Sequence, residues 1–286
     1  MSALRRGPRI ALIVLLCCSS SAIAEELSVG NASISIGLNT ADGTLSVTDK
    51  RIPCTWQQRV LTRGQVTQAE RVAGGIDMTW RQPGFDMDVR VRVRLDEEQP
   101  EFTLELSAQD NLKGSLGFPH PFVTEPGTYL VVPMNEGISY PVDDESIRPR
   151  WLVAYGGHGI CMAFWGVTDG HRGHMAIIET PDDASIYINR IEDRLCIAPK
   201  WQPQKAAFGY SRKLRYVFFD RGGYVAICKR YRSYAKQIGR FKTLAQKRNE
   251  NPNVDLLIGA VNVWCWERDA LSLVRQMNSL GIERLR

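Results

Sequence analysis

Hydrophobic and polar residues alternate with a period of two through most of the first 220 positions. The clearest example is residues 87–95, where every second residue is apolar: Met87, Val89, Val91, Val93 and Leu95. The intervening positions include Arg90, Arg92 and Arg94. On a strand, successive side chains point to opposite faces, so the arginines would line one face and the apolar residues the other. The pattern predicts a half-buried strand with a solvated basic face; a surface for an anionic ligand is the alternative interpretation.

The same alternation predicts further strands. Residues 34–38 and 45–47 flank a turn cluster that ends in Asp42-Gly43, which is typical of a β-hairpin. Other strands are expected at 102–106, Tyr129–Pro133, Trp151–Ala154, Ile160–Trp165, Met175–Glu179, Ser185–Asn189 and Leu214–Phe219. About ten short strands without a convincing helix predict a mainly β protein with an antiparallel β-sandwich domain over residues 25–222.

The period changes after Gly222-Gly223. Apolar residues then recur at steps of three and four: Tyr224, Ile227, Cys228, Tyr231, Tyr234, Ala235 and Ile238. This spacing predicts an amphipathic helix that ends at Gly239, within a linker over residues 223–248. The basic side of this helix, which includes Lys229, Arg230 and Arg232, is expected to face solvent.

Residues 249–286 predict a different architecture. Leu256–Trp264 is a nearly continuous apolar run, as a strand buried on both faces of a parallel sheet requires. Asp269 can cap a following helix, and Ile282–Arg286 resembles the start of another strand. We therefore expect the first β-α unit of a (β/α)8 barrel, which needs about 200–250 residues, and expect the natural sequence to continue. The alternative is a small appendage that packs onto the sandwich.

The N-terminus has the three parts of an export signal. Residues 1–24 contain Arg5, Arg6 and Arg9, then the apolar run Ile10–Cys18, and then Ala22-Ile23-Ala24. The apolar run is too short to span a membrane, so we predict a signal peptide cleaved after Ala24. The mature protein would be secreted or periplasmic, without a membrane span.

Composition and charge narrow the classes of partner. Of 286 residues, 44% are hydrophobic and 23% are charged, which is typical of a globular protein. Residues 25–286 contain 33 basic and 31 acidic residues. This near-neutral balance lacks the positive surface that binds nucleic acid, so we expect no nucleic-acid partner. No phosphate-binding loop is present, and we expect no cofactor.

Five cysteines follow residue 24, and none forms a C-x-x-C pair. An odd number leaves at least one thiol unpaired in an exported chain. Cys161, Cys228 and Cys265 lie in apolar runs and are expected in the core. A disulfide between Cys54 and Cys196 is the one pairing worth testing.

Several segments carry a resemblance to a known enzyme group. They are Leu45-Ser-Val-Thr-Asp-Lys-Arg51 with Trp56, Val132-Pro-Met-Asn-Glu-Gly137, Met175-Ala-Ile-Ile-Glu-Thr180, Tyr231-Arg-Ser-Tyr-Ala-Lys236, Phe241-Lys-Thr-Leu-Ala245, Asn251-Pro252 and Leu257-Ile-Gly-Ala-Val261. Through them the chain resembles the group around glycoside hydrolase families 129 and 101, the α-N-acetylgalactosaminidases and their bacterial relatives. The resemblance implies a galactose-mutarotase-like β-supersandwich before the barrel, and retaining hydrolysis of α-linked N-acetylgalactosamine.

The resemblance also implies that both catalytic carboxylates lie on later barrel strands, so no catalytic residue is assigned and this chain alone is expected to be inactive. In a barrel the carboxyl ends of the strands face the active site. Trp264, Trp266 and Glu267 follow the first predicted strand and are candidates for a substrate-binding rim. An indole can cover a pyranose ring while a carboxylate accepts hydrogen bonds from its hydroxyls. Core or loop packing is the alternative role for the tryptophans.

Two other functions remain open. One is a carbohydrate-binding sandwich without catalysis. The other is a mutarotase-like enzyme, for which His158, His171, His174 and Glu179 supply suitable residue types. His171 and His174 also have a metal-like spacing, but they lie in a predicted turn without an obvious third ligand, so we expect no metal site.

Overall fold

The computed structural model describes residues 26–85, 87–109, 111–153, 159–263 and 269–285. The predicted signal peptide with its cleavage site at Ala24 lies outside these ranges, as do His158 and the three rim candidates Trp264, Trp266 and Glu267. In the described ranges, no helix has the length and apolar character needed to cross a bilayer.

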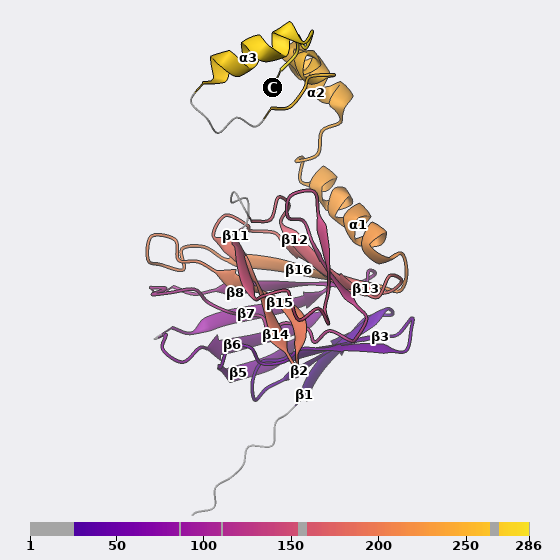
Figure 1. Ribbon diagram of the computed structural model, residues 1–286. Coiled ribbons are helices and arrows are strands. Elements are labelled where there is room, and N and C mark those ends of the chain that lie inside the picture. The colour runs from indigo at the N-terminus through magenta and orange to yellow at the C-terminus, as the bar shows by residue number, and fades with distance from the viewer. Residues whose placement is uncertain (1–25, 86, 110, 154–158, 264–268, 286) are drawn as a thin grey trace, which may run out of the picture.

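The largest element is an antiparallel sheet of nine strands in the order β10-β9-β12-β13-β16-β8-β7-β6-β5 (Figure 1). Its strands are β5 (Gln65–Val72), β6 (Gly75–Arg81), β7 (Val89–Leu95), β8 (Glu101–Ser107), β9 (Tyr129–Val132), β10 (Ile138–Pro141), β12 (Phe164–Thr168), β13 (Gly173–Ile178) and β16 (Arg212–Phe219). Each end of the sheet is a hairpin, β9–β10 and β5–β6, so both edges are formed by short-range pairings.

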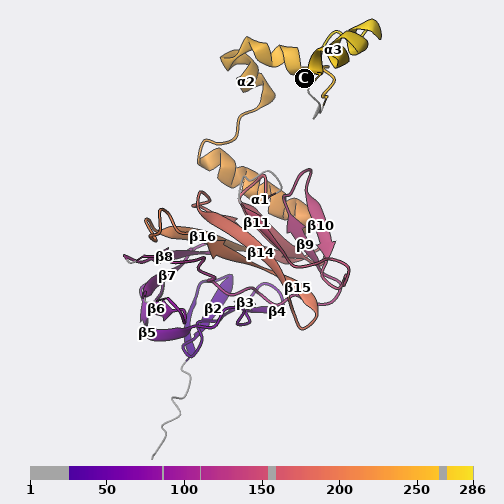
Figure 2. The ribbon, with the colours of Figure 1, turned by 60° about the vertical axis from the view of Figure 1, so that its left-hand side comes forward.

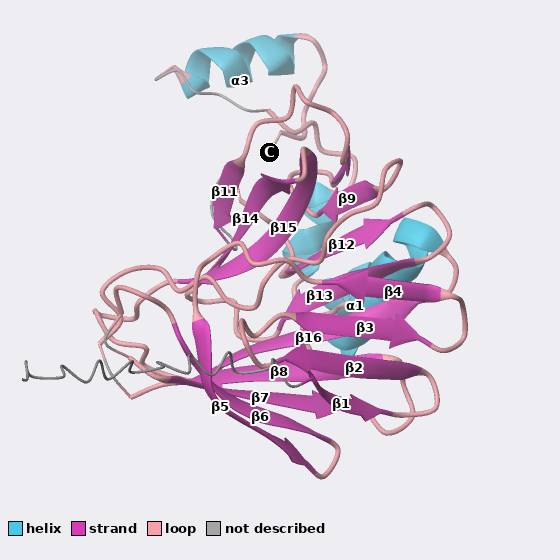
Figure 3. Cartoon of the chain, turned by 90° about the horizontal axis from the view of Figure 1, so that it is seen from below, coloured by secondary structure: helices cyan, strands magenta, loops and turns pink. Residues whose placement is uncertain are grey.

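Two smaller antiparallel sheets complete the sandwich (Figure 3). The first contains β1 (Glu26–Gly30), β2 (Ile34–Asn39), β3 (Leu45–Asp49) and β4 (Cys54–Gln57). The second contains β11 (Arg150–Val153), β14 (Ala184–Ile191) and β15 (Arg194–Trp201). One continuous hydrophobic core contains residues from all three sheets, which confirms the predicted mainly β sandwich.

The alternating pattern of residues 87–95 forms β7 as predicted. Val89, Val91 and Val93 are fully buried, whereas Arg90 and Arg92 are exposed on the opposite face. Val91 and Val93 lie opposite Leu106 and Leu104 of β8. Cross-strand apolar pairs of this kind stabilise a sheet and set its register.

Some strands differ from the prediction. The β5–β6 hairpin and β15 were not predicted, and the strand expected at Ile160–Trp165 begins only at Phe164. β5 is the edge strand of the large sheet and has a register shift between Val66 and Gln68, so its hydrophobic pattern is weak. β15 is buried on both faces over most of its length, so it lacks alternation.

Helix α1 (Gly223–Gln237) lies on the outer face of the large sheet, against β12, β13 and β16 (Figure 2). Its end at Gly239 is confirmed by a left-handed backbone there, with φ of 70°. The buried stripe is narrower than predicted. Ile227 is fully buried, but Tyr224 is 59% exposed.

The contact between α1 and the sheet depends on a glycine. A Cβ atom on Gly166 of β12 would lie 2.7 Å from Cδ1 of Ile227. Beside this contact, the rings of Tyr231 and Phe164 lie 4.6 Å apart. The absence of a side chain at Gly166 therefore lets the helix approach the strand closely.

The expected roles of two cysteines were wrong. Cys161 and Cys228 are exposed rather than in the core. Cys228 directly follows the buried Ile227, so it lies on the flank of a helix that buries only a narrow stripe. Cys54 and Cys196 are buried and free, so the structure does not contain the disulfide considered between them.

The C-terminal segment contains α2 (Leu244–Glu250), the 3-10 helix η1 (Pro252–Leu257) and α3 (Ala270–Ser279). Asp269 caps α3, since its Oδ1 accepts a hydrogen bond from the Ser272 amide at 3.0 Å. The buried strand expected from Leu256 onward is not confirmed, because η1 occupies its start and Leu256 is 64% exposed. One parallel bridge joins Val261 to Leu285. A strand apolar on both faces needs neighbouring strands and covering helices, which the described residues do not supply here.

Candidate functional site

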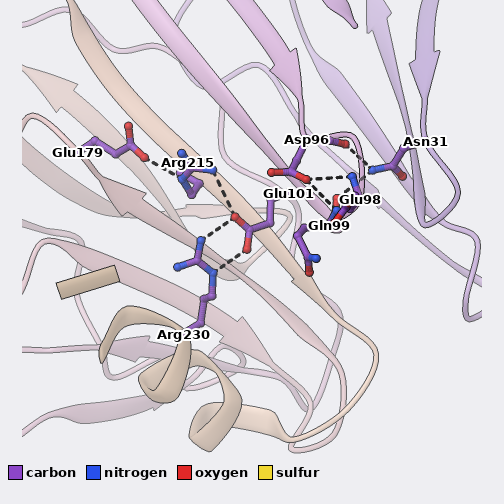
Figure 4. Close-up of polar contacts among 8 residues, drawn as sticks. All are labelled: Asn31, Asp96, Glu98, Gln99, Glu101, Glu179, Arg215 and Arg230. Carbon is purple, nitrogen blue, oxygen red and sulfur yellow. Dashed lines mark hydrogen bonds and ion pairs between the residues drawn. The ribbon is translucent and has the colours of Figure 1, made fainter. Parts of the chain in front are cut away.

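The outer face of the nine-stranded sheet is divided between a covered half and an open half. Helix α1 covers β12, β13 and β16, whereas β5–β8 present polar side chains. A cluster of charged side chains lies at the boundary (Figure 4). Its members are Glu101 of β8, Glu179 at the end of β13, Arg215 of β16 and Arg230 of α1.

Glu101 is the centre of this cluster. Arg230 donates from Nε and Nη2 to the two carboxylate oxygens of Glu101, at 2.6 and 2.7 Å. Arg215 donates from Nη1 to Glu101 at 3.3 Å and from Nε to Glu179 at 2.7 Å. Glu101 is only 6% exposed, so its charge is compensated by guanidinium groups rather than by water.

The neighbouring carboxylates keep the Arg215 guanidinium ionised. Burial alone would lower the pKa of Arg215, but the carboxylates of Glu179 and Glu101 outweigh it and raise that pKa above its ordinary value. A carboxylate held by fixed guanidinium groups is a poor nucleophile or proton donor. The cluster therefore anchors α1 to the sheet rather than performing chemistry.

A neighbouring turn positions Glu101 (Figure 4). The Asp96 carboxylate accepts hydrogen bonds from the amides of Glu98 and Gln99, at 3.0 and 2.8 Å. Asn31 donates from Nδ2 to the Asp96 carbonyl at 2.7 Å. The turn between β7 and β8 is thus joined to the first sheet, which fixes the start of β8 where Glu101 lies.

The structure corrects the expectation that Arg230 faces solvent. Arg230 lies three residues after Ile227 and four before Tyr234, so it belongs to the buried side of the helix. That spacing was the available signal in the sequence. The partner Glu101 is 129 residues away and had no such signal.

Replacing Arg230 with glutamine is expected to lower the free energy of unfolding by about 1–2 kcal/mol, because charge-assisted hydrogen bonds to a nearly buried carboxylate are lost. Urea denaturation followed by circular dichroism measures the change. Arg232→Gln, at an exposed position of the same helix, is the matched control and should leave stability nearly unchanged. Equal losses for the two variants would contradict the anchoring role.

The residues considered for mutarotase-like chemistry are not brought together. His174 points into the core, where its ring contacts those of Trp56, Phe122 and Phe218. Glu179 lies on the opposite face of the sheet with Arg215. Burial lowers the pKa of His174 to about 3, so this ring is neutral near pH 7. His171 lies in the turn before β13 and is exposed.

The described residues contain no group of three His, Cys, Asp or Glu side chains that could hold a metal ion. The two histidines with metal-like spacing differ in environment, since His174 is buried and His171 is exposed. Glu179, which was considered with them only for mutarotase-like chemistry, bonds to Arg215.

The open half of the outer face contains a polar hollow over β5–β8. It is lined by Thr67, Thr79, Arg81, Asp88, Arg90 and Gln109, among others. Arg81 donates from Nε to Asp88 at 2.7 Å and thereby lowers the pKa of that carboxyl. None of the described residues that line this hollow is aromatic, so they offer no surface on which a sugar ring could stack.

Comparisons with known proteins identify the fold. No protein-family description and no curated protein sequence matches the chain. Among solved structures, the sandwich architecture is shared with a carbohydrate-active enzyme. That enzyme is the α-N-acetylgalactosaminidase NagBb from Bifidobacterium bifidum.

The complex of NagBb with GalNAc matches with a TM-score of 0.71 and 18% identity, over 91% of this chain and 51% of that one. Its ligand-free structure matches with a TM-score of 0.69 and 19% identity, over 89% and 49% of the two chains. The present chain thus spans about half the length of these structures. At this level of identity the likeness shows a common fold.

Proposed function

We propose that this chain is the sandwich and linker part of an exported glycoside hydrolase that acts on α-linked N-acetylgalactosaminides. The likeness to NagBb over 91% of this chain is the observation that carries the proposal. The sequence segments that resemble families 129 and 101 support it, and residues 1–24 support export.

The division of roles follows from the chemistry of glycoside hydrolysis. Retaining enzymes use two carboxyl groups about 5–5.5 Å apart, one as nucleophile and one as acid and base. Glu101 and Glu179, the carboxylates of the charged cluster, are bonded to arginines and are unsuited to either role. As the resemblance to families 129 and 101 implies, we assign both catalytic carboxylates to barrel strands outside this chain. Trp264, Trp266 and Glu267 remain our candidates for the rim that contacts the sugar.

An activity assay tests this proposal. Purified residues 25–286 should not hydrolyse an aryl N-acetyl-α-galactosaminide, whereas the product of the complete reading frame should hydrolyse it and retain the anomeric configuration. Release of the aryl group and NMR of the first product measure both properties. Hydrolysis by residues 25–286 alone would show that the catalytic carboxylates are misassigned. A complete product inactive on every α-glycoside would overturn the proposed function.

A further inference from the structure

The three-stranded sheet exposes a pair of aromatic side chains on its outer face. Leu152, Ile186 and Ile197 point into the core, so their neighbours point outward. Trp151 of β11 lies opposite Tyr187 of β14, which in turn lies opposite Ala198 of β15. Trp151 is 50% exposed. The two rings therefore form a row across the sheet, next to the small, buried side chain of Ala198.

Hydrogen bonds fix the position of the indole. Trp151 donates from Nε1 to Oγ of Ser185, and Ser185 donates from Oγ to the Lys200 carbonyl at 3.1 Å. Gln202 donates from Nε2 to the same Ser185 oxygen at 3.1 Å. The Gln202 carbonyl in turn accepts a hydrogen bond from Arg212, which is fully buried.

This chain of bonds connects the exposed indole to the core of the sandwich. A surface aromatic ring that is already ordered loses little conformational entropy when a ligand stacks on it. The arrangement is thus suited to binding in a way that a mobile surface tryptophan is not.

A positive charge lies beside the two rings. Nζ of Lys200 is 5.0 Å from the centroid of the Trp151 ring and 4.6 Å from that of Tyr187. These cation–π contacts hold the ammonium group over one face of each ring. Within the described parts of the chain, no salt bridge joins Lys200 to a carboxylate. The ammonium group is therefore available to an anion from outside the protein.

A small cleft adjoins this aromatic surface. Its lining includes Tyr187, Lys200, Thr62, Gly117 and His120. His120 is only 1% exposed, and its Nδ1 has no hydrogen-bond partner in the structure. A buried polar atom without a partner is rare and indicates a place where a ligand group or water completes the bonding.

We propose that the outer face of β11, β14 and β15 binds an acidic glycan. A pyranose ring stacks on Trp151 and Tyr187, and Lys200 pairs with a carboxylate or sulfate group on the same sugar. Aromatic faces bind the C–H face of a pyranose, and the uncompensated ammonium supplies the charge complementarity that selects an anionic sugar. The proposal is independent of the proposed hydrolysis, since it concerns binding by residues within this chain.

Calorimetric titration of purified residues 25–286 tests the proposal. The probes are a hyaluronan hexasaccharide, which carries carboxylates, a chondroitin sulfate hexasaccharide, which also carries sulfates, and the neutral chitohexaose. We expect binding to at least one acidic probe, at least tenfold tighter than to chitohexaose, and weakening as salt is added. A stronger response to chondroitin sulfate than to hyaluronan assigns the anion as sulfate, and equal responses assign it as carboxylate.

Variants locate the binding to this face. Trp151→Ala should weaken binding of the acidic probe at least tenfold, and Lys200→Met should remove the preference for acidic over neutral probes. Tyr224→Ala, at an exposed aromatic residue of α1, is the matched control and should bind like the wild type. Trp151→Phe retains a ring without the hydrogen bond to Ser185, and should lose less affinity than Trp151→Ala.

Three results would overturn the proposal. They are the absence of binding to both acidic probes, equal affinity for chitohexaose, and unchanged affinity in Trp151→Ala. Thermal unfolding monitored by circular dichroism separates loss of binding from loss of folding. Each of these readouts is independent of galactosaminidase activity, so failure here is distinguishable from failure of the proposed function.

Discussion

Replacing Arg212 with alanine is expected to lower the free energy of unfolding by about 3–5 kcal/mol, which is the largest effect we predict for one substitution. Arg212, Leu214 and Tyr216 are alternate residues of β16 and point to the same, inward face of the sheet. The Arg212 side chain therefore enters the core, where it is fully buried. Its Nη2 donates to the carbonyls of Gln202 and Phe208, at 3.1 and 2.8 Å.

Two further contacts explain the size of this effect. Arg212 donates from Nη1 to the Asp183 carboxylate at 3.3 Å, and its guanidinium carbon lies 3.6 Å from the centroid of the Tyr210 ring. Removing the side chain takes away the hydrogen bonds that it donates to the Gln202 and Phe208 carbonyls, of which the second keeps only the Tyr210 amide, and opens a cavity beneath Tyr210. Both changes are among the few that strongly destabilise a folded protein.

Urea denaturation measured by tryptophan fluorescence tests the role of Arg212. Lys213→Ala is the matched control, because Lys213 is the next residue of the same strand and points to the outer face, near Glu105 at 3.6 Å. The control should change stability by less than about 0.5 kcal/mol, as exposed pairs contribute little. If Arg212→Ala unfolds at the same urea concentration as Lys213→Ala, the structural role assigned to Arg212 is wrong.

Lowering the pH from 6.5 to 4.5 is expected to cost about 2–3 kcal/mol of stability through His174 alone. Burial lowers the pKa of this ring from 6.5 to about 3 in the folded protein. Between those values the unfolded chain binds a proton that the folded chain does not. Stability from this group is therefore complete above pH 6.5 and is lost progressively as the pH falls toward 3.

The comparison of two histidines tests this linkage. His174→Phe removes the titrating group while keeping an aromatic ring among Trp56, Phe122 and Phe218, so its stability should fall less steeply between pH 6.5 and 4.5. His171→Ala changes an exposed histidine of the adjacent turn and should keep the wild-type slope. Identical pH slopes for wild type and His174→Phe would exclude His174 as the source.

The sequence predicts those elements whose local pattern matches their environment. β7 alternates because one face lies on the core and the other faces water. The β2–β3 hairpin was marked by its turn at Asp42-Gly43, and the end of α1 by Gly239. β15 is buried on both faces and the edge strand β5 has no buried residue on either, so neither shows a period of two. For that reason neither strand was predicted.

Partners that are distant in sequence could not be predicted. Glu101 and Arg230 are 129 residues apart, and Trp151 and Ser185 are 34 apart. Helical spacing places Arg230 on the buried side of α1, but only the strand order of the sheet brings Glu101 beneath it. For the same reason the apolar residues after Asn251 predicted a buried strand, while their exposure depends on which other strands are adjacent.

The attachment of α1 has a mechanical consequence. Two residues one turn apart attach the helix to the sheet: Ile227 is buried against it, and Arg230 pairs with Glu101 of β8. The helix is therefore expected to move together with the large sheet. The helix is about 22 Å long and ends at Gln237, so a rotation of the sheet moves Gln237 more than it moves the start of the helix. The six residues from Ile238 to Thr243, between α1 and α2, are then where a rotation between the sandwich and the C-terminal helices would be absorbed (Figure 1).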